Sequence, residues 1–322
     1  MEVVRYHPAL DAEWDAFIET RANNGTLFHK RAFLAYHPPD RFVDDSLLFY
    51  KRGELQAVLP AASWPDHDGQ VLISHPGASF GGLATRPELS LRDATTLVQQ
   101  LKKYALAQEY AALDMTLPPI VYCQKPSNYI DFALYNAGFR YRKREISSVV
   151  ALDVDEAQVL RLFKPEARRA VRRSQKLGVT IREDDDFVAF YDILQHNLKL
   201  RHNVSPTHSL AELQKLVGLF PEKIKLFAAF AEAQMIAGIV LFRATAKTTL
   251  AFYISHIEAF QKYRAVNHLF YEVFRWCIRN RFRFLDFGIF TVNMEPNWGL
   301  ARFKESFGAQ GVFRDSMRLK LS

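Results

Sequence analysis

Two stretches of the sequence repeat the same order of predicted elements, and this repeat limits the possible folds more than any other feature. In each half, a predicted hairpin precedes a short strand, a helix whose apolar residues recur about every 3.6 positions, and a buried strand that contains an aspartate. The buried strands are centred on Leu113-Asp114-Met115 and on Phe284-Leu285-Asp286-Phe287-Gly288. We therefore predict a duplicated domain in which each copy is a mixed α/β sheet with helices.

The predicted elements can be placed by residue number. Strands are expected at 46–50, 55–64, 71–74 and 110–117 in the first copy and at 224–231, 235–243, 248–255 and 284–288 in the second. Asn128 and Asn297 each begin a short helical stretch, which leads to a last strand at 141–152 or at 312–321. The expected domains are residues 1–153 and 154–322.

Length and composition agree with two globular domains. The chain has 322 residues, of which 49% are hydrophobic and 24% charged, so a disordered or low-complexity chain is excluded. No apolar run is long enough for a membrane helix, the first residues lack a signal-peptide pattern, and Cys123 and Cys277 form neither a disulfide nor a metal framework. These features predict a cytoplasmic protein that uses no metal.

Positive charge is concentrated in the middle of the chain. Between Phe139 and Lys176 there are eleven basic residues against five acidic ones, so this segment carries +6 of the net +7. Within it, a helix is predicted from Pro165 to Leu177, with a narrow apolar edge of Ala170, Val171 and Leu177. Its arginines suit an anionic partner such as phosphate or nucleic acid, while a solvated basic face is the alternative: Arg168, Arg169, Arg172 and Arg173.

Several segments together resemble the GNAT acyltransferase superfamily, and within it the Fem-type aminoacyltransferases and their acetyltransferase-like relatives, which have tandem GNAT-like domains. The first copy contributes mainly the loop Pro76-Gly77-Ala78-Ser79-Phe80-Gly81-Gly82. The second copy contributes most of the resemblance, in the segments from Pro165 to Val179, Ala237-Gly238, Tyr253-Ile254-Ser255, Leu285 to Gly288, and Phe303-Lys304-Glu305-Ser306-Phe307-Gly308. The resemblance implies that the C-terminal copy holds the active site.

Two departures from these families bear on the donor. GNAT enzymes bind the coenzyme A pyrophosphate with a glycine-containing loop at a helix start, but here the stretch is Gln261-Lys262-Tyr263-Arg264-Ala265-Val266-Asn267. Charge from Lys262 and Arg264, with Gln261, Asn267 and Ser255 nearby, is the expected replacement. The long helical arm that Fem-type enzymes often carry for aminoacyl-tRNA has no room between residues 178 and 224. Acyl-CoA, and acetyl-CoA in particular, is therefore the expected donor.

Three residues are the candidate catalytic groups. Asp286, at the carboxyl end of a central strand, would orient or deprotonate an acceptor amine, although a structural cap explains both Asp286 and Asp114. Lys304 matches the Phe-Lys pair at the Fem donor site, where an ammonium offsets phosphate or oxyanion charge; the alternative is a solvated lysine paired with Glu305 or Asp286. Tyr253 lies on the strand that bulges in GNAT folds and binds the acyl group, with an ordinary cross-strand hydroxyl as its alternative.

The expected substrate-binding residues are Arg201, His202 and Phe303. Arg201 and His202 lie in a predicted loop that resembles the acceptor side of these relatives, where an arginine grips a carboxylate or phosphate; a plain surface loop is the alternative.

The sequence thus predicts an acyltransferase that moves an acyl group from acyl-CoA to an amine, with a cell-envelope precursor as the acceptor that the family suggests. A Fem-type transferase that uses aminoacyl-tRNA remains open. So does a GNAT-like module without catalysis, which binds a phosphorylated or nucleic-acid partner or serves as a structural subunit.

Overall fold

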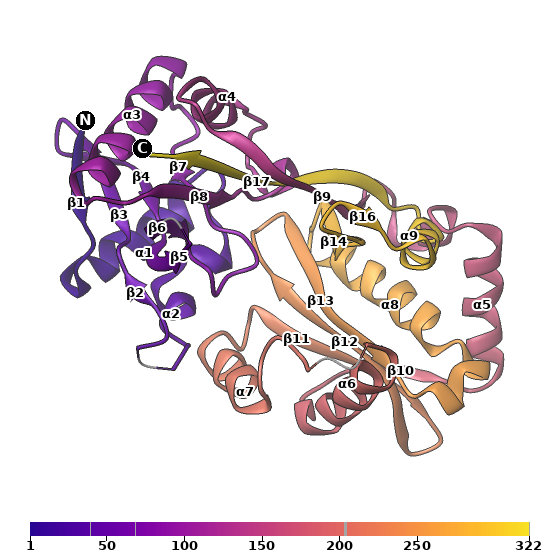
Figure 1. Cartoon of the computed structure of the whole chain (residues 1–322). Coiled ribbons are helices and arrows are strands. Elements are labelled where there is room, and N and C mark those ends of the chain that lie inside the picture. Colours follow the sequence, from indigo (N-terminus) through magenta and orange to yellow (C-terminus); the bar gives the residue numbers. More distant parts are fainter. Residues whose placement is uncertain (39, 68, 203–204, 322) are drawn as a thin grey trace. The chain divides into compact units, whose positions relative to one another are not determined.

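The computed structural model describes residues 1–38, 40–67, 69–202 and 205–321, and its contacts divide the chain into two compact units. Unit 1 comprises residues 1–146 and 313–322, and unit 2 comprises residues 147–312 (Figure 1). The first boundary lies slightly before the one expected at residue 153, and the end of the chain is assigned to unit 1. No helix in the described part of the chain is both long enough and apolar enough to cross a bilayer.

Unit 1 holds the first copy of the repeat. Its elements in chain order are β1 (Glu2–Arg5), η1 (Pro8–Leu10), α1 (Asp11–Thr20), η2 (Leu27–His29), α2 (Arg31–Leu34), β2 (Val43–Asp44), β3 (Leu47–Lys51), β4 (Glu54–Leu59), β5 (Ala61–Asp66), β6 (Gly69–Ser74), β7 (Ala84–Thr85), α3 (Leu91–Ala107), β8 (Ala112–Thr116), η3 (Ile120–Tyr122), α4 (Tyr129–Asn136), the start of β9 (Arg140–Ala151) and the end of β17 (Gln310–Lys320).

Unit 2 holds the second copy. Its elements are the end of β9, η4 (Glu156–Arg161), α5 (Pro165–Lys176), β10 (Thr180–Asp184), α6 (Phe187–His202), α7 (Leu210–Leu219), β11 (Ile224–Ala231), β12 (Gln234–Arg243), β13 (Thr248–His256), η5 (Glu258–Tyr263), α8 (Ala265–Arg279), β14 (Phe284–Ile289), β15 (Thr291–Val292), β16 (Glu295–Pro296), α9 (Trp298–Glu305) and the start of β17 (Gln310–Lys320).

One predicted strand of unit 1 is wrong in its length. The stretch expected at 55–64 is divided at Pro60 into β4, which belongs to the sheet β1-β3-β4-β7, and β5, which belongs to the order β17-β8-β6-β5-β2. Proline has no N–H to donate to a strand ladder, so the chain changes sheets there. The Pro60 carbonyl instead accepts a hydrogen bond from His75 N at 3.1 Å.

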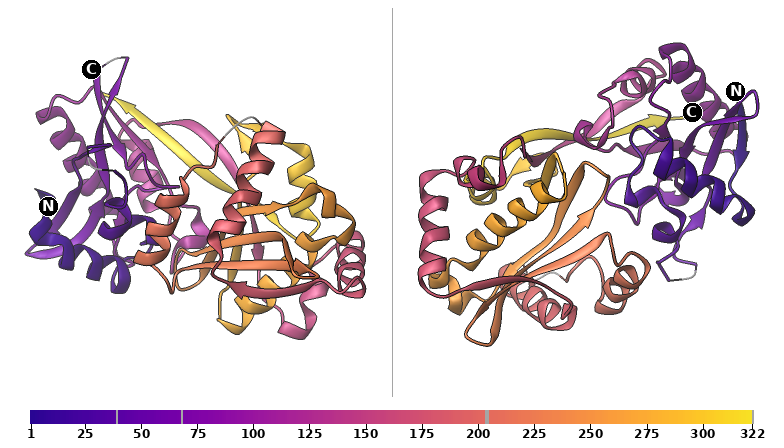
Figure 2. Two further views of the ribbon diagram at one scale, coloured as in Figure 1. Left: turned by 90° about the horizontal axis from the view of Figure 1, so that it is seen from below. Right: turned by 180° about the vertical axis from the view of Figure 1, so that it is seen from behind.

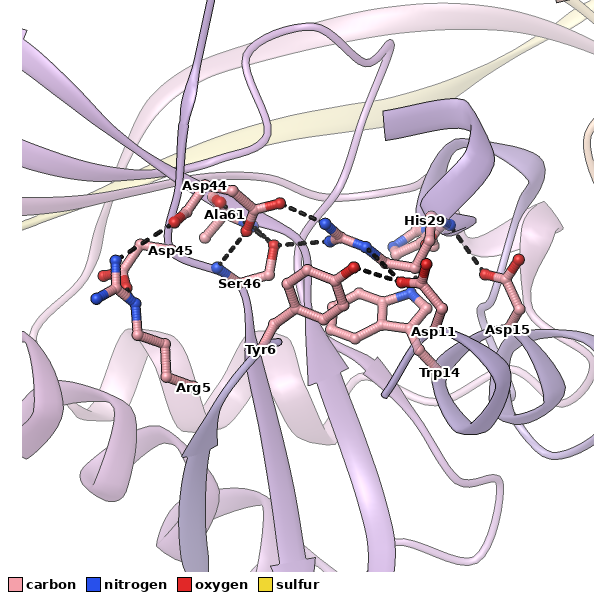
Figure 3. Close-up of polar contacts among 11 residues, drawn as sticks. Arg5, Tyr6, Asp11, Trp14, Asp15, His29, Asp44, Asp45, Ser46 and Ala61 are labelled. Carbon is pink, nitrogen blue, oxygen red and sulfur yellow. Dashed lines mark hydrogen bonds and ion pairs between the residues drawn. The ribbon is translucent and has the colours of Figure 1, made fainter. Parts of the chain in front are cut away.

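A buried arginine joins the N-terminal elements of unit 1. The Arg31 guanidinium lies 3.5 Å from the centroid of the Tyr6 ring and donates to Ser46 Oγ at 3.1 Å, and it also contacts Asp44. The Trp14 indole N–H donates to the His29 carbonyl at 2.7 Å (Figure 3). These contacts satisfy a charge that would be costly to bury alone, and they tie α1 and α2 to strands β2 and β3.

Unit 2 is a sheet of order β10-β11-β12-β13-β14-β9 with helices on both faces (Figure 2). Helix α8 packs its apolar face on β11, β12 and β13, and α6 packs on β12 and β13 from the other side. Gly238 permits the approach of α6, because a Cβ atom there would lie 2.5 Å from Cδ2 of Phe190.

The last strands of the two copies exchange places. Strand β9, which ends the first copy, pairs antiparallel with β14 of unit 2 through residues such as Val149 and Asp286. Strand β17, which ends the second copy, pairs antiparallel with β8 of unit 1 from Ser316 opposite Thr116 to Lys320 opposite Ala112. Each unit therefore depends on a strand from the other half of the sequence.

Candidate functional site

The candidate site lies in unit 2, where two parallel strands stop pairing. Strands β13 and β14 are paired from Thr248 opposite Phe284 to Leu250 opposite Asp286. Beyond this point β13 stays paired with β12 as far as His256, whereas β14 pairs with β9. The two central strands therefore diverge after Asp286, and ligands of open α/β sheets bind at such strand ends.

A bulge in β13 lies directly beyond the last paired residue. In the register with β12, Val240 is opposite Tyr253 and Leu241 is opposite Ala251, so Phe252 is the extra residue. Among the described residues, Phe252 has no partner in the ladders with β12 or β14. A bulge disrupts the ladder locally and re-aims the backbone at that point. The bulge expected in this strand is thus present in the structure.

Lys304 is a buried cation at the end of β14. Its side chain comes from α9, is 2% exposed, and donates from Nζ to the carbonyls of Gly288 at 2.7 Å and Ile289 at 2.8 Å. Burial lowers the pKa of Lys304 from 10.5 to about 8, while the Asp286 carboxylate acts in the opposite direction. The burial of Lys304 rules out a solvated lysine, and Glu305 pairs with Lys164 at 3.5 Å. The interaction with Asp286 agrees with the other part of that alternative.

Asp286 shapes the turn that holds Lys304. Its Oδ1 accepts hydrogen bonds from Ser147 Oγ at 2.6 Å and from Gly288 N at 2.7 Å. Gly288 has a φ of +71°, a conformation that favours glycine, so the sequence Asp-Phe-Gly suits this turn. The carboxylate therefore fixes the backbone whose carbonyls bind Lys304.

Tyr253 and Ser255 point to the face of the sheet that α6 covers, and their hydroxyls have protein partners. Tyr253 Oη accepts from His208 N at 3.0 Å and lies 2.8 Å from His208 Nδ1, and burial raises the pKa of Tyr253 to about 12. Ser255 Oγ accepts from Asn197 Nδ2 at 3.2 Å and donates to the Ile193 carbonyl at 3.3 Å. Because both hydroxyls are bonded to protein groups, the backbone of this strand is a better candidate for binding a ligand than either side chain.

The start of α8 keeps an unusual backbone despite lacking glycine. Arg264 precedes the helix in the left-handed region, with a φ of 52°, and its side chain does not cap the first turn. Lys262 and Gln261 are exposed on η5, and Asn267 N donates to the Arg264 carbonyl at 3.1 Å. Of the first-turn amides, that of Asn267 is thus already bonded, and the Arg264 side chain caps none of the others.

The expected substrate-binding residues differ in what the structure describes. Phe303 is partly buried among aromatic rings, with its centroid 5.1 Å from that of Phe307. The side chains of Arg201 and His202 lie outside the described residues. Their backbone is the last part of α6, so the loop expected from residue 201 begins later.

The basic helix α5 exposes its cations. Ala167, Val171 and Ser174 form its buried edge, so the predicted edge is wrong at Leu177, which is 44% exposed. Arg169, Arg172 and Arg173 are exposed and Arg168 is half-buried, and none of them has an acidic partner in the part of the chain that the structure covers. Nor do three His, Cys, Asp or Glu side chains come together there as metal ligands.

Comparison with known proteins identifies the arrangement. Residues 162–305 match the family model described as "Acetyltransferase (GNAT) domain". The chain superposes on the crystal structure of FemX with a TM-score of 0.76 at 14% identity, over 100% of this chain and 98% of that one. It has the tandem GNAT fold. The predicted fold class is therefore confirmed.

Two further structures share this fold. One is the C-terminal domain of a putative lysylphosphatidylglycerol synthetase from Agrobacterium fabrum, with a TM-score of 0.61 at 12% identity over 96% of this chain and 91% of that one. The other is a tandem GNAT protein from the clavulanic acid biosynthesis pathway, with a TM-score of 0.56 at 12% identity over 99% of this chain and 98% of that one. None of the curated proteins matches the sequence.

Sequence reasoning missed the partners that hold the candidate site together. Ser147 lies in β9, at the end of the first copy, and only the exchanged strand brings it to Asp286. His208 precedes α7, and no sequence pattern indicates that the fold brings it to Tyr253. A glycine two residues after Asp286 was the one sequence signal of the turn at Gly288.

Proposed function

We propose that the protein is an N-acyltransferase of the GNAT type, which moves an acyl group from an acyl-CoA thioester to an amine. The buried ammonium of Lys304 at the point where β13 and β14 diverge is the observation that carries this proposal. A buried cation is costly even with two carbonyl acceptors, and a substrate that develops negative charge there gives a reason for it.

The roles follow from the contacts. A backbone N–H at the Phe252 bulge would donate to the acyl carbonyl oxygen as negative charge develops on it. Lys304 has three N–H groups, and the carbonyls of Gly288 and Ile289 take two of them, which leaves one for a substrate oxygen. Asp286 would act as a positioning residue, because its carboxylate already binds Ser147 and Gly288.

The start of α8 supports a CoA donor. The left-handed conformation of Arg264 gives the chain a turn that glycine usually provides, and the first amides of α8 follow it. Lys262 and Arg264 add positive charge at the same place. Acetyl-CoA is the first donor to test, and an amine on a cell-envelope precursor is the first acceptor.

A Fem-type donor, aminoacyl-tRNA, is the second candidate. The exposed arginines of α5 favour it, because their planar guanidinium groups suit phosphate. A module without catalysis is less well supported, since it leaves the buried Lys304 without a role.

The test combines binding and turnover. Acetyl-CoA, longer acyl-CoAs and charged tRNA are each added to the purified protein, and the shift in melting temperature is measured, because a ligand of the folded state stabilises it by mass action. Acyl transfer to a panel of amines follows, with the Lys304→Met variant as the matched control. Stabilisation by charged tRNA alone would favour the second candidate, and no ligand effect with unaltered Lys304→Met behaviour would contradict both.

A further inference from the structure

Unit 1 carries an aromatic surface that the proposed reaction does not use. It is formed by the outer face of α4 and the neighbouring parts of β9 and β17. Its large side chains are exposed by 42 to 55%: Tyr129, Phe132, Tyr135, Tyr141 and Phe313. Monomeric proteins rarely gather large apolar side chains in one exposed place unless something binds there. We refer to these five residues as the aromatic surface.

Direct contacts make much of the aromatic surface continuous. The Arg144 guanidinium lies 4.3 Å from the Tyr141 ring centroid and 3.9 Å from that of Phe313. The Tyr135 and Tyr141 ring centroids are 6.4 Å apart, and Arg140 lies 4.8 Å from the Tyr135 centroid. Three of the five rings, those of Tyr135, Tyr141 and Phe313, are thus connected with Arg140 and Arg144.

Helix α4 is apolar on both of its faces. Ala133 and Leu134 are buried in the core of unit 1, whereas Tyr129, Phe132 and Tyr135 point outward at helical spacing. A helix at a protein surface normally has a polar outer face, and an apolar one indicates a second apolar environment. Asp131 is the sole charged residue in the helix.

Positive charge borders this face. Arg140, Arg142, Lys143 and Arg144 follow α4 with no acidic residue among them. Asp315 holds Arg144, with contacts of 2.9 and 3.1 Å, and Asp114 holds Arg142 at 2.7 Å, so these carboxylates fix both guanidinium groups and offset part of their charge. Arg140 bonds to the backbone carbonyls of Tyr135 and Phe139 and keeps its full charge. Aromatic rings beside arginines are suited to the interface between lipid headgroups and acyl chains.

We propose that the aromatic surface docks unit 1 onto an anionic lipid bilayer, with the rings at headgroup depth and the arginines against lipid phosphates. A second copy fits less well, because a two-fold interface would bring the basic segments of both copies together. Single-stranded nucleic acid also fits less well, because Arg140 and Arg144 already lie against rings on which bases would stack. This inference does not depend on the proposed acyl transfer.

The test uses the full chain and sucrose-loaded vesicles in a sedimentation assay. Vesicles of phosphatidylcholine with 30% phosphatidylglycerol, about that fraction being enough to give a clearly negative surface, are compared with pure phosphatidylcholine vesicles. We expect binding to the anionic vesicles that weakens as salt rises. Phe132→Ser should weaken it about tenfold by removing an inserted ring. Arg140→Gln should weaken it about fivefold by removing one cation near the surface.

Lys103→Gln provides the matched control, because Lys103 is an exposed cation on α3 in the same unit but outside the aromatic surface. It should change binding by less than about twofold. Circular dichroism and melting temperature verify that each variant is folded. The proposal is overturned if the wild-type chain ignores anionic vesicles, or if Phe132→Ser and Arg140→Gln bind as Lys103→Gln does. It is equally overturned if these two variants instead abolish self-association or oligonucleotide binding.

Discussion

The two copies of the repeat place an aspartate at the same point and use it differently. Ile73 is opposite Asp114 in the parallel pair β6–β8, as Leu250 is opposite Asp286 in β13–β14, and both pairs extend over three positions. Asp114 binds Arg142 at 2.7 Å and faces Arg318, whereas Asp286 holds a turn that carries a buried lysine. Equal topology therefore does not imply equal chemistry.

In the first copy, hydrogen bonds connect the end of β8 with the end of β6 and the loop that follows it. Gly81 N donates to the Thr116 carbonyl at 2.9 Å, and Thr116 N donates to Ser74 Oγ at 2.9 Å. The loop after β6 thus occupies the place where β6 and β8 would separate. Tyr135 follows Asn128 by the same number of residues as Lys304 follows Asn297, so the two occupy equivalent positions in the repeat. Unlike Lys304, Tyr135 is exposed. The difference favours the second copy as the working one.

The largest expected effect that tests this comparison is the loss of Lys304. Lys304→Met should lower kcat by about two to three powers of ten, near the effect of removing one oxyanion donor. Its stability should stay close to that of the wild type, because an apolar side chain of similar size replaces a buried charge. Tyr135→Met is the matched change in the first copy and should leave turnover unaltered; equal loss in both variants would contradict the assignment.

The next effect is pH dependence. Because burial lowers the pKa of Lys304 to about 8, kcat should fall as pH rises through that value and the ammonium is lost. Between about 8 and 10.5 the folded protein has released a proton that the unfolded chain keeps, so the wild type should gain stability over Lys304→Met as pH rises. The full gain is about 3 kcal/mol. Denaturant unfolding across this range measures it. If the free energy of unfolding changes with pH in the same way in both proteins, Lys304 is solvent-exposed and the prediction is wrong.

A smaller effect separates the two aspartates. Asp286→Ala should lower kcat about tenfold and move the pH midpoint to lower values, because Lys304 loses a favourable carboxylate. Asp114→Ala should leave both unchanged but cost about 1 kcal/mol of stability by removing the carboxylate that pairs with Arg142. Steady-state rates over pH, with melting curves, distinguish the outcomes, and a shifted midpoint in Asp114→Ala would reverse the roles.

The smallest effect concerns the hydrogen bond between the ends of β6 and β8 in the first copy. Ser74→Ala removes the acceptor of Thr116 N and should cost about 1 kcal/mol without altering turnover. Ser63→Ala is a suitable control, since its hydroxyl bonds to Gln70 at an exposed place in the same sheet region. Chemical denaturation of both variants provides the comparison, and a change in kcat for Ser74→Ala would place the first copy in the reaction.

The sequence predicted much of this fold because periodicity and turn residues are local signals. Strand β11 and helix α5 begin where they were expected, and Asn297 caps α9 through Leu300 N at 3.0 Å. The exchange of β9 and β17 could not be predicted, since each strand has the same pattern whichever sheet it joins. The burial of Lys304 was missed for a related reason, because carbonyls of β14 that carry no sequence signal receive it.

The exchanged strand β17 also affects the order in which the protein can be made. Met317 and Leu319 are part of the hydrophobic core of unit 1, and their backbone pairs with β8. During synthesis these residues emerge only after the whole of unit 2, so the edge of β8 that β17 covers stays open until then. Domains usually fold as they leave the ribosome, the N-terminal one first. Here the first unit must wait until the whole of unit 2 has been made, and a nascent chain that stops before β17 would keep an open strand edge for chaperones to protect.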